Sequence, residues 1–357
     1  MKKILLLLIV VASTLFAQKI TVIDTVNATT MEQFKVPAEK NIVIANVLRI
    51  QINASLLDAS LNPIRECKNL FQDPSNADIK KKTKGGRGTN VQFAVFETIE
   101  EEGTYYVKID IKVKGERGRG KKTVYYLVNV KYPEIVAPIE LNEKGYYYSE
   151  TKSFSIATVQ FSNPNLYSYK IFSSSGNVIE EKKGAVVVLD SVLSDLRYVG
   201  QKIKVVGYYN GKPFKYREIG SNEVHNTEWE ILIKQPKINE FTDWRNVDNK
   251  KEEPVIISAY NYKAMKILYS YFGKTQSGFV VVKPEIKGFS LTSEPQGLVI
   301  NARPIKTGSW LYVQFELSQD YLDGIEEYGQ VDAKIHVRFR TQFNEKIDRT
   351  YDATIYK

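Results

Sequence analysis

Short stretches of alternating apolar and polar residues recur along the chain, and each predicts a β-strand. In the stretch 334–339, apolar residues alternate with Lys334, His336 and Arg338, so one face of the strand is apolar and the other is wet. The stretch 105–111 combines two tyrosines with β-branched residues, which strands favour, and the chain holds 23 tyrosines in all. Long helical periods are missing from the sequence, so the pattern predicts an all-β protein.

Turn residues separate these stretches and predict hairpins. The segment 175–177, Ser-Gly-Asn, lies between two strand-like stretches, and Asn210-Gly211 lies between two more. Asn-Gly is strongly favoured in two-residue hairpin turns, because both residues tolerate positive φ. The only helices that we expect are short turns at 191–199 and 319–328, where apolar residues are three or four positions apart.

One short phrase, an aliphatic residue followed four positions later by glycine, occurs three times. It is found at 99–103, 196–200 and 325–329, and each copy is followed by a strand-like stretch, a turn and a second strand-like stretch. A period of roughly one hundred residues, with each unit closing on two paired strands, predicts tandem β-modules.

Prolines that follow the predicted terminal strands mark the boundaries between modules. Pro133 and Pro236 each follow such a strand, and proline stops the pairing of a ladder. The predicted domains are therefore 18–133, 134–236 and 237–357. Their length, turn density and strand content favour three tandem immunoglobulin-like sandwiches of antiparallel strands.

The repeated phrase also predicts local geometry. Its glycines reverse the chain from turn to strand within few residues, so we expect positive φ at two or more of Gly103, Gly200 and Gly329. We further expect the aliphatic residue of each copy to be buried beneath the turn. These residues are Ile99, Leu196 and Ile325.

The closing part of the modules resembles a known family. The segment 319–329, the strands 333–340 and 350–356, and the polar turn between them look like the end of the periplasmic domains of the GldM/PorM family. Those are the stalk proteins of the gliding and type IX secretion motor in Bacteroidota, and 103–130 resembles the same element. The stalk proteins keep an uncleaved membrane helix and a helical first periplasmic domain, and neither is expected here. The resemblance therefore implies an exported relative and not the stalk itself.

The first seventeen residues predict an export signal. Lys2 and Lys3 precede the apolar stretch 4–17, and Ala17 suits cleavage. A retained membrane anchor is the alternative, but this stretch is shorter than the ~20 residues that a spanning helix needs. We therefore expect a signal peptide at 1–17 and a periplasmic or secreted protein.

The cysteine count and the distribution of charge further limit the kind of protein and the kind of partner that we expect. Cys67 is the single cysteine, so no internal disulfide can form, and we expect it to be a small buried hydrophobe. The predicted first domain has a net charge of +6, whereas residues 134–357 have a net charge of +1. The basic character belongs to the first domain and points to an anionic partner there. Nucleic acid is not an expected partner of an exported chain.

Basic residues of the first domain form the candidate binding site. They occupy a glycine-containing loop and a predicted hairpin tip. If the two groups lie together, they produce a positive potential that attracts lipid phosphates, acidic glycans or an acidic protein surface. The alternative is a solvated loop and tip kept soluble by charge. The predicted site residues are Lys80, Lys81, Lys82, Lys84, Arg87, Lys112, Lys114, Arg117, Arg119, Lys121 and Lys122.

Other clusters give weaker chemical signals. The acidic run 100–102 with Glu97 could supply paired carboxylates for glycoside hydrolysis, but we expect a solvated face. The oxygen-bearing residues in 243–253 match no calcium-loop spacing, and the two histidines are far apart, which does not favour a zinc site. We expect Tyr146 and Tyr148 to pack in a core or against a neighbouring domain.

The sequence holds no serine-elbow, phosphate-loop or dinucleotide fingerprint. We therefore expect a non-catalytic exported protein with no cofactor or metal, acting as a structural or protein-interaction scaffold of the bacterial envelope. The resemblance implies a link to gliding or type IX secretion. The alternative interpretation is a binding module that holds an anionic glycan, a lipid phosphate or an acidic protein through the basic tip of the first domain.

Overall fold

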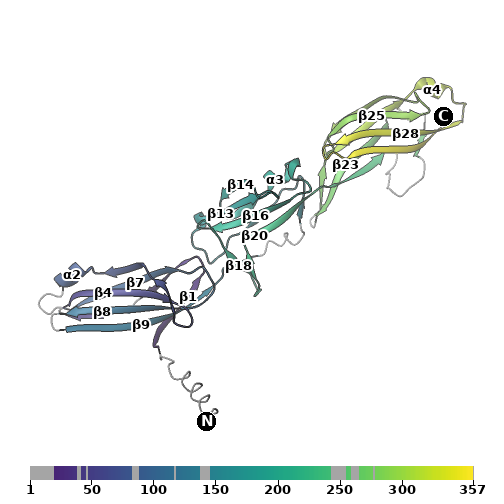
Figure 1. The fold of residues 1–357 in the computed structure, drawn as a ribbon. Coiled ribbons are helices and arrows are strands. Elements are labelled where there is room, and N and C mark those ends of the chain that lie inside the picture. Colours follow the sequence, from purple (N-terminus) through teal and green to yellow (C-terminus); the bar gives the residue numbers. More distant parts are fainter. Residues whose placement is uncertain are drawn as a thin grey trace, which may run out of the picture. The chain divides into compact units, whose positions relative to one another are not determined.

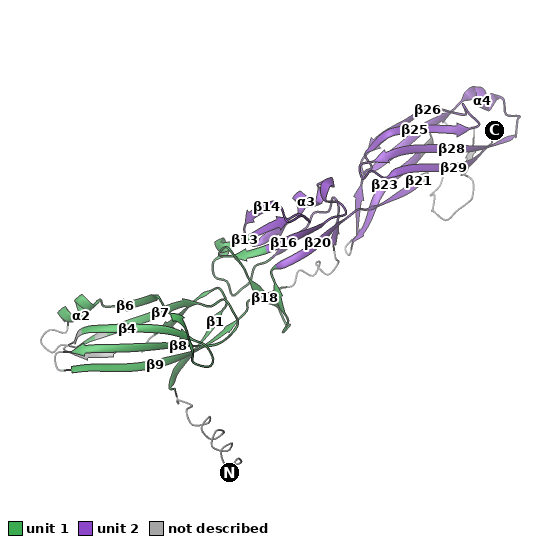
Figure 2. Ribbon diagram, in the orientation of Figure 1, with its two compact units in different colours: residues 1–137, 156–168, 207–227 green, residues 138–155, 169–206, 228–357 purple. Residues whose placement is uncertain are grey.

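The computed structural model is built mostly of β-strands, with a few short helices (Figure 1). Contact density divides the chain into two compact units (Figure 2). The first is residues 1–137, 156–168 and 207–227, and the second is residues 138–155, 169–206 and 228–357. The all-β prediction is confirmed. The structure describes residues 20–37, 42–45, 47–82, 88–115, 118–136, 145–242, 255–258, 265–275 and 278–356.

The first unit contains a sandwich of two sheets. One sheet has the strand order β1-β9-β8-β4-β5, and the other has the order β2-β7-β3 with β6 also paired to β7. The strands are β1 Val22–Thr29, β2 Gln33–Pro37, β3 Ile42–Ala45, β4 Val47–Leu57, β5 Pro63–Glu66, β6 Asn69–Asp73, β7 Gly88–Thr98, β8 Gly103–Gly115 and β9 Gly118–Lys131. Helix α2, Asn76–Lys82, lies between β6 and β7 in the sequence.

The same unit includes a small three-stranded sheet, β10-β18-β19, and a two-residue strand β17. Their bounds are β10 Glu134–Ile135, β17 Lys212–Pro213, β18 Lys215–Glu218 and β19 Val224–Asn226, with the 3-10 helix η2 at Pro164–Leu166.

A second sandwich lies in the second unit, at the C-terminal end of the chain. Its sheets are β21-β23-β27-β26, with β24 also paired to β23, and β22-β29-β28-β25. The elements are β21 Lys237–Thr242, β22 Val255–Ser258, β23 Met265–Thr275, β24 Gly278–Val282, β25 Ile286–Glu294, β26 Val299–Thr307, β27 Trp310–Leu317, α4 Gln319–Asp323, β28 Gln330–Thr341 and β29 Lys346–Tyr356.

Strands from the middle of the chain form the sheet β11-β20-β16-β13-β14 and the pair β12-β15. Strands β13 and β16 contribute residues to both units, so the division by contacts does not follow the predicted domain boundaries. The partition into 18–133, 134–236 and 237–357 stays a prediction. The elements are β11 Gly145–Tyr147, β12 Ser153–Ser155, β13 Tyr167–Phe172, β14 Val178–Lys183, β15 Val186–Val188, α3 Asp190–Leu193, η3 Leu196–Tyr198, β16 Lys202–Tyr209 and β20 Glu228–Lys234.

A parallel contact between an early and a late strand recurs three times. β1 pairs in parallel with β9, β11 with β20, and β22 with β29, whereas most other pairs are antiparallel. At β11 the contact requires glycine, because a Cβ on Gly145, where φ is +151°, would lie 2.2 Å from the carbonyl oxygen of Leu232. The sheets are immunoglobulin-like in architecture.

The strands form where the sequence alternates, because alternate side chains enter a core between two sheets. In β8, Val107, Ile109 and Ile111 are at most 2% exposed. The predicted apolar face of β28, with Ile335, Val337 and Phe339, is buried in the same way. Burial of this kind supplies the main driving force for each sandwich.

A buried polar network joins the two sheets of the C-terminal sandwich. Arg349 on β29 donates to Glu240 on β21 at 2.6 Å, and the Tyr351 hydroxyl donates to the same carboxylate at 3.0 Å. The Tyr351 and Tyr269 hydroxyls are 2.6 Å apart. Burial raises the pKa of both tyrosines well above the ordinary value. Since every member has a partner, the network is structural in character.

The predicted hairpins are confirmed. Strands β13 and β14 flank the turn at 175–177 and are neighbours in one sheet. In the second turn, Tyr209 pairs with Lys212 across Asn210 and Gly211, whose φ angles are +50° and +74°. Both positive values fit the two-residue hairpin turn that Asn-Gly predicts.

The three copies of the repeated phrase precede topologically equivalent strands. They lead into β8, β16 and β28, and these strands pair antiparallel with β9, β20 and β29. The glycine prediction, however, is wrong. Gly200 has φ +81°, but Gly103 and Gly329 do not have positive φ. Near Gly329, the left-handed residue is Tyr328, with φ +65°, so the reversal occurs one residue early.

The burial prediction for the phrase holds at two sites and fails at one. Ile99 and Ile325 are 4% and 7% exposed, whereas Leu196 is 40% exposed. In the middle copy, Val192 and Leu193 of α3 are completely buried, so that helix inserts its apolar residues and leaves Leu196 outside.

The predicted signal peptide lies outside the described residues. Within the described residues, no helix is long and apolar enough to span a membrane.

Candidate functional site

Strands β4, β8 and β9 lie side by side (Figure 1). Their register brings several cations onto one outward face. Lys112 on β8 is directly opposite Lys121 on β9, and Lys114 is directly opposite Arg119. On its other side, Lys114 is opposite Arg49 of β4. Alternation explains the shared face, because the residues between them, such as Ile111, point toward the core.

We call these five residues, Arg49, Lys112, Lys114, Arg119 and Lys121, the basic face. All five are exposed. Together with neighbouring residues they line a depression of about 500 Å³. Gln51, which is opposite Lys112, adds an amide to the same depression. The arrangement is therefore a hollowed, positively charged surface on regular strands.

The basic face places like charges directly opposite one another, which destabilises a sheet by roughly 0.2–1 kcal/mol per pair. Three such pairs occur: Lys112 with Lys121, Lys114 with Arg119, and Arg49 with Lys114. Among the described residues, none of the five forms an ion pair. Apart from the attraction between Lys121 and Asp110, the charges are thus available to a ligand.

Asp110 lies next along β8 but is already bound. Lys108 forms an ion pair with it at 3.1 Å, and the Thr123 hydroxyl donates to it at 2.5 Å. Burial opposes ionisation of Asp110, but these hydrogen bonds and the charges of Lys108 and Lys121 together lower its pKa. The carboxylate therefore stays ionised and marks where the basic face ends.

The remaining described site residues lie on helix α2 or on the other side of β9. Lys122 is opposite Ile111 and lies on the other side of β9. Lys80, Lys81 and Lys82 are exposed, but they belong to α2. Lys84, Arg87 and Arg117 lie outside the described residues. The prediction that the loop and the hairpin tip form one patch stays a prediction.

The expected loop at 80–82 is wrong, because these residues end a helix. The backbone N–H of Asp78 bonds the Ser75 hydroxyl at 3.3 Å, and that hydroxyl donates to the Asp78 carboxylate at 2.6 Å. Ile79 is completely buried and fixes the helix to the core. The signal that sequence reasoning missed is Ser75-x-x-Asp78, a capping pattern before an apolar residue.

Arg49 is the member of the site that sequence reasoning missed. It is 63 residues before Lys112 in the sequence, and only the pairing of β4 with β8 places it opposite Lys114. No local motif identifies it, because contacts between distant strands depend on register.

The acidic run 100–102 forms a second charged cluster within the first unit. Glu100 pairs with Lys212 at 2.5 Å, Glu101 with Lys215 at 3.0 Å, and Glu102 with Arg217 at 2.5 Å. Glu100 and Glu101 are exposed, as expected of a solvated face, but all three glutamates also have cationic partners.

Glu101 also accepts a hydrogen bond from the Tyr132 hydroxyl at 2.5 Å. This bond and that from Lys215 lower the pKa of Glu101. A nearby carboxylate, Glu32, accepts hydrogen bonds from Tyr209 at 2.5 Å and from the Ser162 backbone at 2.9 Å. The carboxylates thus attach the segments 156–168 and 207–227 to the first sandwich, which is a structural role.

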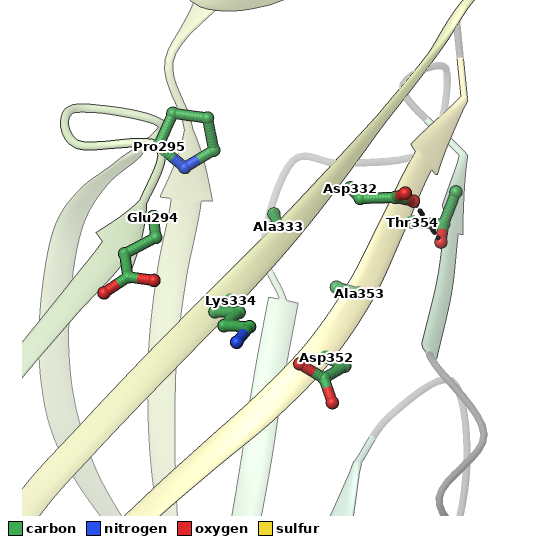
Figure 3. A pocket seen from close by; sticks show the side chains of 8 residues that line it. All are labelled: Glu294, Pro295, Asp332, Ala333, Lys334, Asp352, Ala353 and Thr354. Carbon is green, nitrogen blue, oxygen red and sulfur yellow. Dashed lines mark hydrogen bonds between the residues drawn. The ribbon is translucent and has the colours of Figure 1, made fainter.

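A second depression, of about 520 Å³, lies on β25, β28 and β29 (Figure 3). Lys334 lies between Glu294 and Asp352 in the cross-strand register, and Thr354 donates to Asp332 at 2.9 Å. Three carboxylates and one lysine line this depression, so its charge is negative, opposite in sign to that of the basic face. Among the described residues, no group of three or more histidine, cysteine or acidic side chains could hold a metal ion.

The predictions for Cys67, for Tyr146 and Tyr148, and for the segment 243–253 can be compared with the structure. Cys67 is 8% exposed, as expected, and burial followed by the charge of Glu97 raises its pKa to about 12, which makes it unreactive. Tyr146 is buried, and Tyr148 packs edge-on against Phe343, as predicted. The segment 243–253, considered for calcium, lies outside the described residues.

Comparisons with known proteins show no family for this chain. No family model and no curated protein matches the chain. Three solved structures illustrate the likeness. An ICAM-5 ectodomain fragment is 8% identical, with 93% of this chain and 75% of that chain covered and a TM-score of 0.21.

The sialic acid binding region of a Streptococcus sanguinis adhesin is 10% identical, with 94% and 76% covered and a TM-score of 0.25. The zebrafish RET cadherin-like domains are 12% identical, with 97% and 73% covered and a TM-score of 0.23. None of these likenesses bears on a ligand or a partner of this chain.

Proposed function

We propose that this protein is an exported, non-catalytic binding protein whose basic face holds an anionic ligand. The observation that carries the proposal is the set of three directly opposed like-charge pairs on β4, β8 and β9. A sheet has no stability reason to place Lys112 against Lys121, because the pair repels. An anionic group seated between them turns the repulsion into attraction.

The site is of a kind that serves binding. The cations stand on strands, which hold their spacing fixed, and line a depression. The carboxylate clusters described above already have partners: Glu240 is bound by Arg349 and Tyr351, and Asp110 by Lys108 and Thr123. They have no evident role in catalysis.

A structural role in the bacterial envelope is compatible with this binding function. Tandem sandwiches can act as a scaffold that displays one ligand-binding surface. The link to gliding or type IX secretion stays a prediction that rests on the closing segments of the modules. Export likewise rests on the sequence of residues 1–17.

Retention on anionic matrices tests the proposal. We compare the protein with the double variant Arg119→Ser/Lys121→Ser on heparin, polyphosphate and polyglutamate columns. The matched control is Lys202→Ser/Lys204→Ser, which removes the same charge from β16, where Lys202 and Lys204 have partners in Glu230 and Glu228. The first variant should elute at much lower salt, because screened charge–charge attraction dominates binding, whereas the control should elute with the unmodified protein.

If both variants elute at the same salt concentration as the unmodified protein, the basic face is only a solvated surface. Equal loss in both would mean that net charge alone governs retention. Melting temperatures of all three proteins are measured in parallel, so that loss of folding is not mistaken for loss of binding.

A further inference from the structure

The basic face ends at an open edge of its sheet. β9 lies between β1 and β8, but β1 pairs with it only from Tyr125 onward. In the part of the chain that the structure describes, residues 118–124 of β9 therefore have a neighbouring strand on the β8 side alone. Such an edge presents backbone N–H and C=O groups that can pair with another strand.

Two glycines lie on this edge, and their contacts with the described residues do not require glycine at either position. Neither Gly118 nor Gly120 has positive φ, and a Cβ on either would meet no atom within 4 Å. Other residues would therefore fit both positions. Glycine in a strand often marks the close approach of a ligand or of another backbone. Gly120 is opposite Val113, which is only partly buried, so the missing side chain leaves an apolar surface uncovered.

From these observations, and resting on the proposed function, we infer that the anionic ligand is an extended acidic polypeptide that adds as a strand to residues 118–124 of β9. Its backbone pairs with the open edge. Its acidic side chains, at alternate positions, meet Arg119 and Lys121, and the side chains between them cover Gly118 and Gly120.

The edge itself favours a polypeptide over a phosphate polymer or a lipid surface. A strand edge offers acceptors as well as donors, and only a partner with N–H groups satisfies both. Cations along the edge repel a second basic strand, and thus a second copy of this edge, while they attract an acidic one. The alternating pattern of cations and glycines matches the two-residue period of strand side chains.

Peptides of equal charge test strand addition. The first peptide alternates Glu and Val, and the second has the same composition in Glu-Glu-Val-Val repeats, which breaks the two-residue period. Two further versions of the first peptide carry N-methyl groups on every Glu or on every Val, and each removes the donors along one edge. Affinity is measured by fluorescence anisotropy, and amide hydrogen exchange is followed at residues 118–124.

Strand addition predicts at least ten-fold tighter binding of the alternating peptide than of the block peptide. One N-methylated version should lose binding and the other should retain more of it, and exchange at 118–124 should slow on binding. Gly120→Val should weaken binding of the alternating peptide several-fold and leave polyphosphate retention unchanged. The fold should accept this change, because a Cβ at position 120 would meet no atom within 4 Å.

Equal affinity for the alternating and block peptides would overturn strand addition. Binding of polyphosphate, or of vesicles of equal parts phosphatidylglycerol and phosphatidylcholine, without preference for the alternating peptide would leave the proposed function intact and remove this inference. Failure of every anionic probe to bind would remove both.

Discussion

The first and last sandwiches contain a sheet of the same strand order, but the charged residues that face one another on it differ. The strand order β1-β9-β8-β4 in one corresponds to β22-β29-β28-β25 in the other, including the parallel first pair. On the outward face of the first, Lys112 faces Lys121 and Lys114 faces Arg119. On the outward face of the last, Lys334 faces Asp352 and Arg338 faces Asp348.

The pairing in the last sandwich is close. Arg338 and Lys346 both contact the Asp348 carboxylate at 3.1 Å. Among the described residues, like-charge pairs occur there next to the turn, where Arg340 faces Lys346 on one side and Lys287 on the other. Arg340 also contacts Asn344, and Lys346 also contacts Asp348. The equivalent strands of the middle sheet also interleave charges: Lys202 pairs with Glu230 at 3.2 Å and Lys204 with Glu228 at 2.5 Å.

The comparison teaches that solubility alone does not explain the basic face. Away from the row of cations at the turn of the last sandwich, the two equivalent surfaces of the same chain interleave acids and bases, which also stabilises the sheet. The cations of the first sandwich differ from the row in the last in that no ion pair joins them to a described carboxylate, whereas Lys346 has Asp348. Departures from local stability rules concentrate at functional sites.

The largest predicted effect concerns the cores, where the two sandwiches should agree. Ile109 and Ile335 are both completely buried, on β8 and β28. Replacing either with alanine should reduce the free energy of unfolding by roughly 2–5 kcal/mol, because each change leaves a cavity. Denaturant unfolding measures both. A large loss of unfolding free energy in only one variant would show that the two cores are not comparable. The last sandwich could then no longer serve as the control for the basic face.

Charge changes on the outward faces should alter stability by a smaller amount, with opposite sign in the two sandwiches. Lys121→Glu converts a like-charge pair into an attractive one and should stabilise the first sandwich by about 0.2–1 kcal/mol. Asp352→Lys makes the reverse change opposite Lys334 and should destabilise the last by a similar amount. Thermal melts at low salt report the difference, and added salt should reduce it. Changes in melting temperature of the same sign would show that the charges on the two outward faces do not differ in their effect on stability.

Low pH should weaken the ion pairs on the outward face of the last sandwich and so lower its stability. Hydrogen bonds from Lys346 and Arg338 hold the pKa of Asp348 below its ordinary value of 3.8. A carboxyl whose pKa is lowered by folding stabilises the folded state above its unfolded pKa, and this contribution is lost as pH falls through the folded pKa. Asp348→Asn should therefore reduce the acid-dependent loss of melting temperature measured between neutral pH and about pH 3. An unchanged acid profile would mean that these ion pairs do not affect stability.

Sequence pattern predicts the strands and part of the site. Alternation locates β8 and β28, and Asn210-Gly211 fixes a turn, because both signals are local. Lys112, Lys114, Arg119 and Lys121 are recognised because one hairpin carries them all. Arg49 is not, because its position depends on the register between distant strands.

Local conformation at the repeated phrase is also beyond the sequence. Gly200 adopts positive φ, but near Gly329 the preceding Tyr328 does so instead. Leu196 is exposed because α3 supplies Leu193 to the core, a competition between neighbours that spacing alone does not reveal. The acidic run 100–102 likewise gains its partners from 212–217, more than a hundred residues away.

The double variant Lys112→Gln/Lys121→Gln tests the central claim most directly, since it removes one like-charge pair with little change in side-chain size. Its melting temperature and its retention on polyglutamate are measured together. We expect opposite changes: the melting temperature stays level or rises, because repulsion is removed, while the salt concentration needed for elution falls. Unchanged retention, or a fall in melting temperature comparable to that of a core variant, would contradict the claim.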